Sequence, residues 1–106
     1  MDVVGYVQAF NDAVVTGSWD HFVGSFADDA LMEFHGPPVG PFTGRDAIGL
    51  AYRENPPTDT IELAGDTREE GDVVVAPYRW CATGETGTMR LRFSDGKVTW
   101  LSVTFD

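Results

Sequence analysis

The chain has 106 residues, of which 42% are hydrophobic and 12% aromatic, so it is long enough for one globular domain, residues 1–106, with a single core. Its net charge is −10, from 17 acidic and 7 basic residues, and this negative field disfavours nucleic acid and anionic membrane surfaces as partners. No apolar run approaches the roughly 20 residues that span a bilayer, and the N-terminal segment lacks the basic region of a signal peptide. We therefore expect a cytoplasmic protein.

The first quarter of the chain has the spacing of helices. One apolar stripe recurs at helical spacing, formed by Val3, Val7, Phe10 and Val14. Gly17 is a helix-ending residue, and a second, shorter stripe occupies the segment Trp19–Phe26. These patterns predict two helices before the first strand.

The next segment combines a strand, a loop and a helix. Ala30–Phe34 is predicted to be a short strand, because it is apolar and follows two aspartates. The loop His35–Gly44 contains three prolines, which lack the N–H that a helix or a central strand needs. Thr43 is predicted to cap a third helix at about Gly44–Glu54, which ends before Pro56.

From Thr58 onward the apolar residues recur with a period of two, which is typical of strands. Asp95-Gly96 is a strong hairpin signal, and Pro77 is expected at a bulge or an edge. The predicted strands begin after Thr58 and continue at Val73–Ala82, Met89–Phe93 and Val98–Phe105. Three helices followed by a four-stranded antiparallel meander predict an α+β fold, with the helices packed on one face of a curved sheet.

Several motifs carry a resemblance to a known family. The sequence WDHFVGSFADDALMEF, the Gly/Pro-rich loop and the following GRDAI resemble the SnoaL-like and ketosteroid-isomerase-like branch of the nuclear transport factor 2 superfamily. The resemblance implies a cone-shaped α+β fold with a pocket between the sheet and the helices, and a homodimer formed through the outer face of the sheet. The activities that it implies include isomerases, cyclases, hydrolases and dehydratases, and some members only bind.

The catalytic residues of a ketosteroid isomerase are absent. The resemblance would place the oxyanion-hole tyrosine at Phe10, the aspartate base at Phe34 and the second aspartate at Met89. These three side chains can neither take a proton from carbon nor donate a hydrogen bond to an enolate. We therefore do not expect ketosteroid isomerase activity from this chain.

The same resemblance predicts an apolar pocket for a small molecule. The expected lining residues are Phe10, Phe34, Tyr52, Trp80, Met89, Leu101 and Val103. His35 is expected at the mouth of the pocket, where an ordinary histidine pKa of about 6.5 suits acid–base catalysis, and Tyr78 is expected to offer a hydroxyl to a ligand. The alternatives are a solvated histidine and a purely structural tyrosine, and Tyr6 is likewise interpreted as a core residue.

No cluster with metal-ligand spacing, no phosphate loop and no dinucleotide motif is present, so we expect neither a metal nor a cofactor. Two classes of function remain open. The first is an enzyme that acts on a small apolar or polycyclic metabolite through His35 and Tyr78. The second is a non-catalytic domain that binds an apolar ligand, or a purely structural homodimer.

Overall fold

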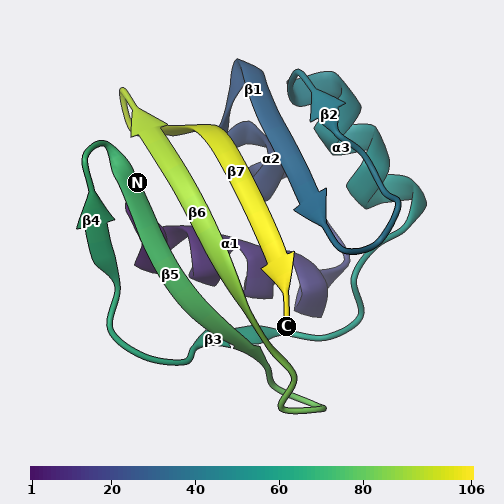
Figure 1. Cartoon of the computed structure of the whole chain (residues 1–106). Coiled ribbons are helices and arrows are strands. Elements are labelled where there is room, and N and C mark those ends of the chain that lie inside the picture. The colour runs from purple at the N-terminus through teal and green to yellow at the C-terminus, as the bar shows by residue number, and fades with distance from the viewer.

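The computed structural model describes the whole chain, from Met1 to Asp106, as three helices and a curved, open sheet of seven strands (Figure 1). The helices are α1 (Val3–Thr16), α2 (Asp20–Gly24) and α3 (Arg45–Glu54). The strands are β1 (Phe26–His35), β2 (Phe42–Thr43), β3 (Ile61–Leu63), β4 (Arg68–Glu70), β5 (Val73–Trp80), β6 (Thr86–Ser94) and β7 (Lys97–Phe105). The α+β class and the packing of helices against a curved sheet are confirmed.

The strand order is β2-β1-β7-β6-β5-β3, and β4 pairs with the first part of β5. Strands β5, β6 and β7 form the expected antiparallel meander, and Asp95 and Gly96 make the predicted tight turn with positive φ angles of 53° and 75°. However, β7 runs parallel to β1, so the complete sheet is mixed and only the meander is antiparallel as predicted. A period of two indicates a strand but does not encode its direction, which depends on how distant segments meet.

Strand β1 is twice as long as predicted, because the two aspartates that indicated a turn lie inside it. Phe26 pairs with Val98, but the next pair is Leu31 with Trp100, so the intervening β1 residues form a bulge. Asp28 lies on this bulge and forms an ion pair with Arg45 of α3. The acidic pair therefore marks an irregularity within the strand and not its beginning.

The strand expected after Thr58 is limited to the three residues of β3, and a side chain makes hydrogen bonds to its free edge. The Asn11 side chain of α1 donates a hydrogen bond to the carbonyl of Ile61 (2.8 Å) and accepts one from its N–H (2.9 Å). An amide carries both a donor and an acceptor, so it can replace the backbone of a neighbouring strand. These two hydrogen bonds connect α1 to the edge of the sheet.

Pro77 lies at a position of β5 where its missing N–H disrupts the hydrogen bonds of the sheet least. Strand β4 pairs with β5 up to Val75 and β3 pairs with it from Tyr78 onward, so Pro77 stands opposite the gap between them. Its carbonyl accepts a hydrogen bond from the N–H of Ala64 in that gap (2.9 Å). Strand β5 ends at Trp80, and Cys81 follows in an exposed turn instead of the predicted strand.

Two details of the helices also differ from the predictions. The buried face of α1 is formed by Val3, Tyr6, Ala9, Phe10 and Ala13, so Val7 and Val14 lie at its margin. Small alanines let the helix approach the core closely, which counting large apolar residues does not reveal. Thr43 belongs to β2, and α3 begins after Gly44 without a side-chain cap.

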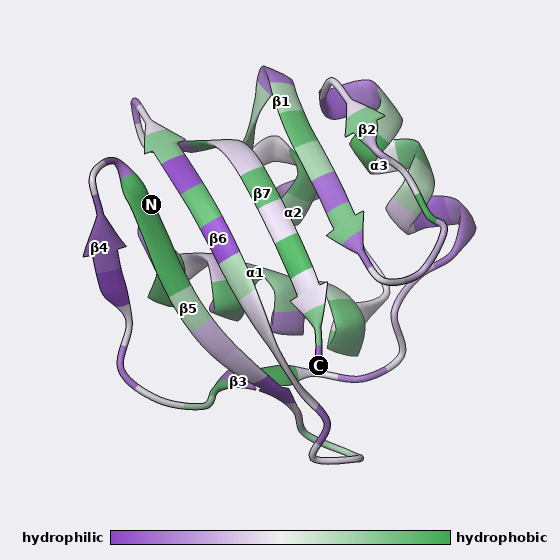
Figure 2. Cartoon of the chain, in the orientation of Figure 1, coloured by the Kyte–Doolittle hydropathy of each residue, from purple (hydrophilic) through white to green (hydrophobic).

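The sheet has an inner face toward the helices and an outer face away from them. Figure 2 shows hydrophobic bands that alternate with hydrophilic ones along β6 and with nearly neutral ones along β7, whereas the first half of β5 is continuously hydrophobic. On β6, Met89 and Leu91 point inward and are buried, while Arg90 and Arg92 point outward.

We predict that replacing Asn11 with alanine lowers the free energy of unfolding by about 2–3 kcal/mol, because the N–H and the carbonyl of Ile61 both lose their partner. Chemical denaturation of the two proteins measures the difference. The matched control is Asn55→Ala at an exposed position after α3, which is expected to change stability by less than about 0.5 kcal/mol. Equal losses in the two variants would contradict the role assigned to Asn11.

Candidate functional site

A cavity of about 190 Å³ lies between the inner face of the sheet and helices α1 and α3. We refer to it as the inner cavity. Its lining comes from both helices, from five strands and from the segment after α3, and consists of Tyr6, Phe10, Phe34, Tyr52, Pro57, Ile61, Tyr78, Trp80, Met89, Val103 and Phe105. No charged side chain is among these residues, so the cavity is an apolar site with a few polar atoms.

Most of the residues that the sequence predicts for the pocket do line the inner cavity, namely Phe10, Phe34, Tyr52, Tyr78, Trp80, Met89 and Val103. Leu101 does not. Its side chain points inward but has no exposed surface, because it pairs with Met32 and Leu91 in the middle of the sheet and is covered by the core.

His35 lies outside the cavity. Successive residues of a strand point to opposite faces, so Phe34 points inward while His35, paired with Thr104, points outward and is exposed. His35 borders a separate hollow of about 290 Å³ beneath the proline-rich loop. Consequently His35 and Tyr78 lie on opposite faces of the sheet and do not form one catalytic pair.

The sequence prediction omitted Pro57, Ile61 and Phe105, and it assigned Tyr6 only to the core. The strand period could have identified Phe105, which lies two residues beyond Val103 and therefore on the same face. The helical period could have identified Tyr6, which lies one turn before Phe10 on the same side of α1. Nothing in the sequence shows that Pro57, which follows α3, returns to the cavity.

Tyr78 reaches the cavity because its neighbour on β6 has no side chain. It pairs with Gly87, and a β-carbon at Gly87 would lie 2.6 Å from the Tyr78 hydroxyl oxygen and would also collide with the carbonyl oxygen of Thr104. Glycine therefore makes room for the phenol ring. The Tyr78 hydroxyl is buried, and it is the one buried side-chain polar atom without a hydrogen-bond partner in the protein.

All three tyrosines of the chain line this one cavity. Burial raises the pKa of each phenol above its ordinary value of 10.0. Interaction with Tyr52 raises the pKa of Tyr6 further, so these two hydroxyl groups lie close together. The inner cavity thus presents neutral hydroxyl groups, which can donate hydrogen bonds but cannot act as bases near neutral pH.

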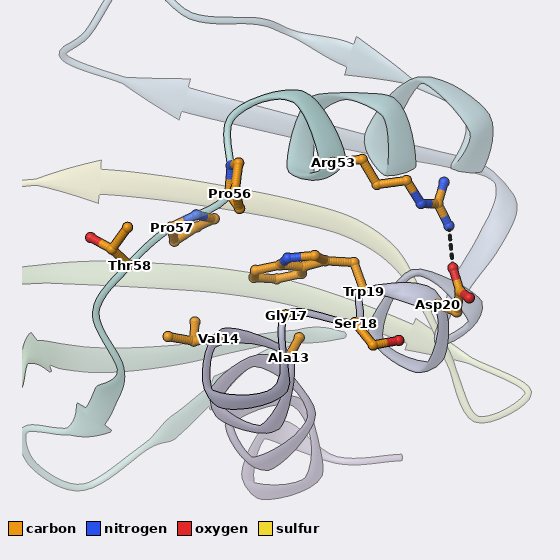
Figure 3. Close-up of a pocket in the computed structure, with 10 residues that line it drawn as sticks. All are labelled: Ala13, Val14, Gly17, Ser18, Trp19, Asp20, Arg53, Pro56, Pro57 and Thr58. Carbon is orange, nitrogen blue, oxygen red and sulfur yellow. Dashed lines mark hydrogen bonds and ion pairs between the residues drawn. The ribbon is translucent and has the colours of Figure 1, made fainter.

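A larger hollow, of about 620 Å³, is lined by Trp19 and by residues from the ends of α1 and α3 (Figure 3). In this view Trp19 lies between Pro56 and Pro57 on one side and the end of α1 on the other. Only three of its ten lining residues are hydrophobic, and Arg53 and Asp20 form an ion pair beside it (2.8 Å). None of the residues predicted for the site lines this hollow.

Residues 7–101 match the family model described as the SnoaL-like domain. The chain belongs to the SnoaL-like domain family. The resemblance seen in the sequence motifs is therefore confirmed over most of the chain. A comparison with curated proteins finds no match.

Solved structures share the fold of this SnoaL-like domain. A candidate polyketide cyclase from Sinorhizobium meliloti has a TM-score of 0.69 and 21% identity, over 93% of this chain and 93% of that one. A candidate ketosteroid isomerase from Kribbella flavida has a TM-score of 0.69 and 17% identity, over 96% of this chain and 76% of that one. An NTF2-like protein of unknown function from Cytophaga hutchinsonii has a TM-score of 0.67 and 18% identity, over 100% and 91%. At such identities the likeness shows the fold alone.

The inner cavity of this SnoaL-like domain contains no carboxylate. The nearest acidic residue on β1, Glu33, points to the outer face, where it accepts a hydrogen bond from the Trp100 indole (3.2 Å). No three His, Cys, Asp or Glu side chains are grouped so that they could hold a metal ion. None of the three helices has the length and the apolar character that crossing a membrane requires.

The raised pKa values predict how the domain responds to alkali. An unfolded chain releases its phenolic protons near pH 10, whereas the folded domain retains them, so the free energy of unfolding should fall as the pH rises above about 10. Because no tyrosine lies elsewhere, tyrosinate absorbance should increase only as the domain unfolds, which circular dichroism follows in parallel. Reversible ionisation of a tyrosine near pH 10 with an unchanged dichroism spectrum would contradict the buried, neutral cluster.

Proposed function

We propose that this SnoaL-like domain binds a small apolar molecule that carries one hydrogen-bond acceptor, such as a carbonyl group, in the inner cavity. The observation that carries the proposal is the buried, unpaired hydroxyl of Tyr78, a residue that is 1% exposed and lines the cavity. Burying a hydroxyl without a partner costs about 1–3 kcal/mol. A ligand oxygen at this hydroxyl would recover that cost, while the aromatic walls would exclude water from the rest of the ligand.

The volume of the cavity limits the size of the group that it accepts. An apolar cavity of about 150 Å³ is known to bind benzene, and the inner cavity has about 190 Å³. This volume suits one six-membered ring with a small substituent. It is too small for a fused, polycyclic ring system, so a monocyclic ketone is the ligand class that we favour.

Binding is favoured over proton transfer because the cavity offers donors without a base. The three phenols remain neutral at physiological pH, and the imidazole of His35 faces away from them. Abstraction of a proton needs a basic group within hydrogen-bond reach of the substrate. A ligand-binding domain therefore agrees with the residues better than an isomerase or a cyclase.

Acetophenone and ethylbenzene test this proposal, because they have nearly the same shape and differ in the carbonyl group. We expect the wild type to bind acetophenone about tenfold more tightly than ethylbenzene, which corresponds to one hydrogen bond of about 1.4 kcal/mol. Tyr78→Phe should bring the two affinities together. Both affinities can be measured from the fluorescence of Trp80, with Trp80→Phe to identify that signal, and from thermal shifts.

Two outcomes would overturn the proposal. One is the absence of any thermal shift or Trp80-dependent signal with both compounds. The other is an unchanged preference for acetophenone in Tyr78→Phe. The variant itself should fold, because removing an unpaired hydroxyl group takes away no hydrogen bond.

The outer face of the sheet supports a second part of the proposal, a homodimer. Four of the seven basic residues lie on this face, namely Arg68, Arg79, Arg90 and Arg92. Four acidic residues accompany them, namely Glu33, Glu62, Glu70 and Asp72. The net charge of −10 is therefore carried by the rest of the surface, which repels a second copy, whereas two outer faces can meet without net repulsion.

We predict a dimer in sedimentation experiments, weakened by Arg90→Glu, which gives each outer face an excess of negative charge. Arg90 belongs to none of the five ion pairs, so the change breaks no bridge within the chain. The control is Arg53→Glu on α3, which alters the net charge equally on the helical side. It breaks the exposed Arg53–Asp20 pair, which contributes at most about 1 kcal/mol to folding. A monomeric wild type, or equal dissociation in the two variants, would contradict this interface.

A further inference from the structure

Another hollow, of about 470 Å³, lies beside the inner cavity and opens to the surface. We call it the outer groove. Six of its eight lining residues are hydrophobic and none is charged, and the lining consists of Met32, Phe34, Val39, Phe42, Ala51, Tyr52, Asn55 and Pro57. An uncharged, apolar groove of this kind suits a hydrocarbon group and does not suit an ionic one.

Three residues, Phe34, Tyr52 and Pro57, line both the inner cavity and the outer groove. Tyr52 is held in place because its ring stacks on Trp19 at a centroid distance of 4.9 Å and an angle of 15°. Pro57 is rigid because of its ring. Phe34 is only half-buried, so it is the one shared wall whose side chain can turn without disrupting the core.

The Phe34 ring stands between the two spaces. On the side of the groove it meets Phe42 at a centroid distance of 6.3 Å, with the rings nearly perpendicular at 80°. On the side of the cavity it meets Phe105 at the same distance of 6.3 Å, with the rings at 31°. The position of Phe34 therefore determines how far a group in the inner cavity can extend toward the surface.

We infer that the outer groove is a second subsite, which takes an apolar tail of the ligand, and that Phe34 is the specificity-determining residue between the two subsites. The inference rests on the proposed function, because the carbonyl-bearing head must occupy the inner cavity. The cavity alone is smaller than the roughly 300–1,000 Å³ of typical small-molecule sites. The ligand class that follows is a monocyclic ketone with an unbranched hydrocarbon chain, and fused ring systems are excluded while Phe34 stands between the subsites.

A series of alkyl phenyl ketones, beginning with acetophenone and lengthened one methylene at a time, tests the groove. We expect the affinity of the wild type to rise about fourfold with each methylene until the groove is filled. Val39→Asp, at a groove residue that is 47% exposed, should abolish most of this gain by placing a charge against the tail. The matched control is Val15→Asp on α1, which is 78% exposed and lines none of these hollows, and which should retain the gain.

Phe34→Ala tests the dividing wall. The variant should improve the binding of a fused bicyclic ketone, acetonaphthone, relative to acetophenone by at least about tenfold, because the space of the Phe34 ring joins the two subsites. If this variant does not fold, the comparison of Val39→Asp with Val15→Asp still decides the existence of the tail subsite.

The outcomes separate this inference from the proposed function. Binding of acetophenone without any gain along the series, or an equal gain in Val39→Asp and Val15→Asp, would overturn the tail subsite while the binding function stands. An unchanged preference in a folded Phe34→Ala protein would overturn the role of Phe34. If no ketone of the series binds, the proposed function and this inference both fail.

Discussion

The rest of the structure depends on the packing of the buried Phe22 ring against its neighbours. The ring is fully buried where all three helices meet the sheet, with centroids 5.4 Å from Tyr6, 5.1 Å from Tyr52 and 5.3 Å from Phe26. Helix α2 has five residues, too few to be stable by itself. Its place is therefore fixed by this ring, which packs at steep angles against its neighbours, as aromatic quadrupoles prefer.

The same cluster determines the chemistry of the cavity. The rings of Tyr6 and Tyr52 both pack against Phe22, and both residues also line the cavity. Tyr78 approaches from the sheet, where Gly87 makes room for it. The cavity consequently combines aromatic walls with neutral hydrogen-bond donors and has no carboxylate or imidazole in its lining.

The two faces of the sheet differ in their chemical character. The inner face supplies one wall of the cavity and carries no charged side chain there. The outer face carries arginines next to carboxylates, as in the pair Arg79–Glu62 (3.0 Å). On the same face the guanidinium carbon of Arg92 lies over the Trp100 ring, 4.7 Å from its centroid. Because successive residues alternate between the faces, one strand can contribute to an apolar site and to a polar surface at once.

The sequence by itself determined the class of fold, the three helices, the meander and most of the cavity lining, because these follow from the local periods of two and 3.6 residues and from family motifs. Tertiary structure alone decided the parallel pairing of β1 with β7, the bulge at Asp28 and the edge formed by Asn11, since each depends on contacts between distant segments. It also decided that His35 faces away from the cavity. Its side is set by the register of β1, and a shift of one residue would have reversed it.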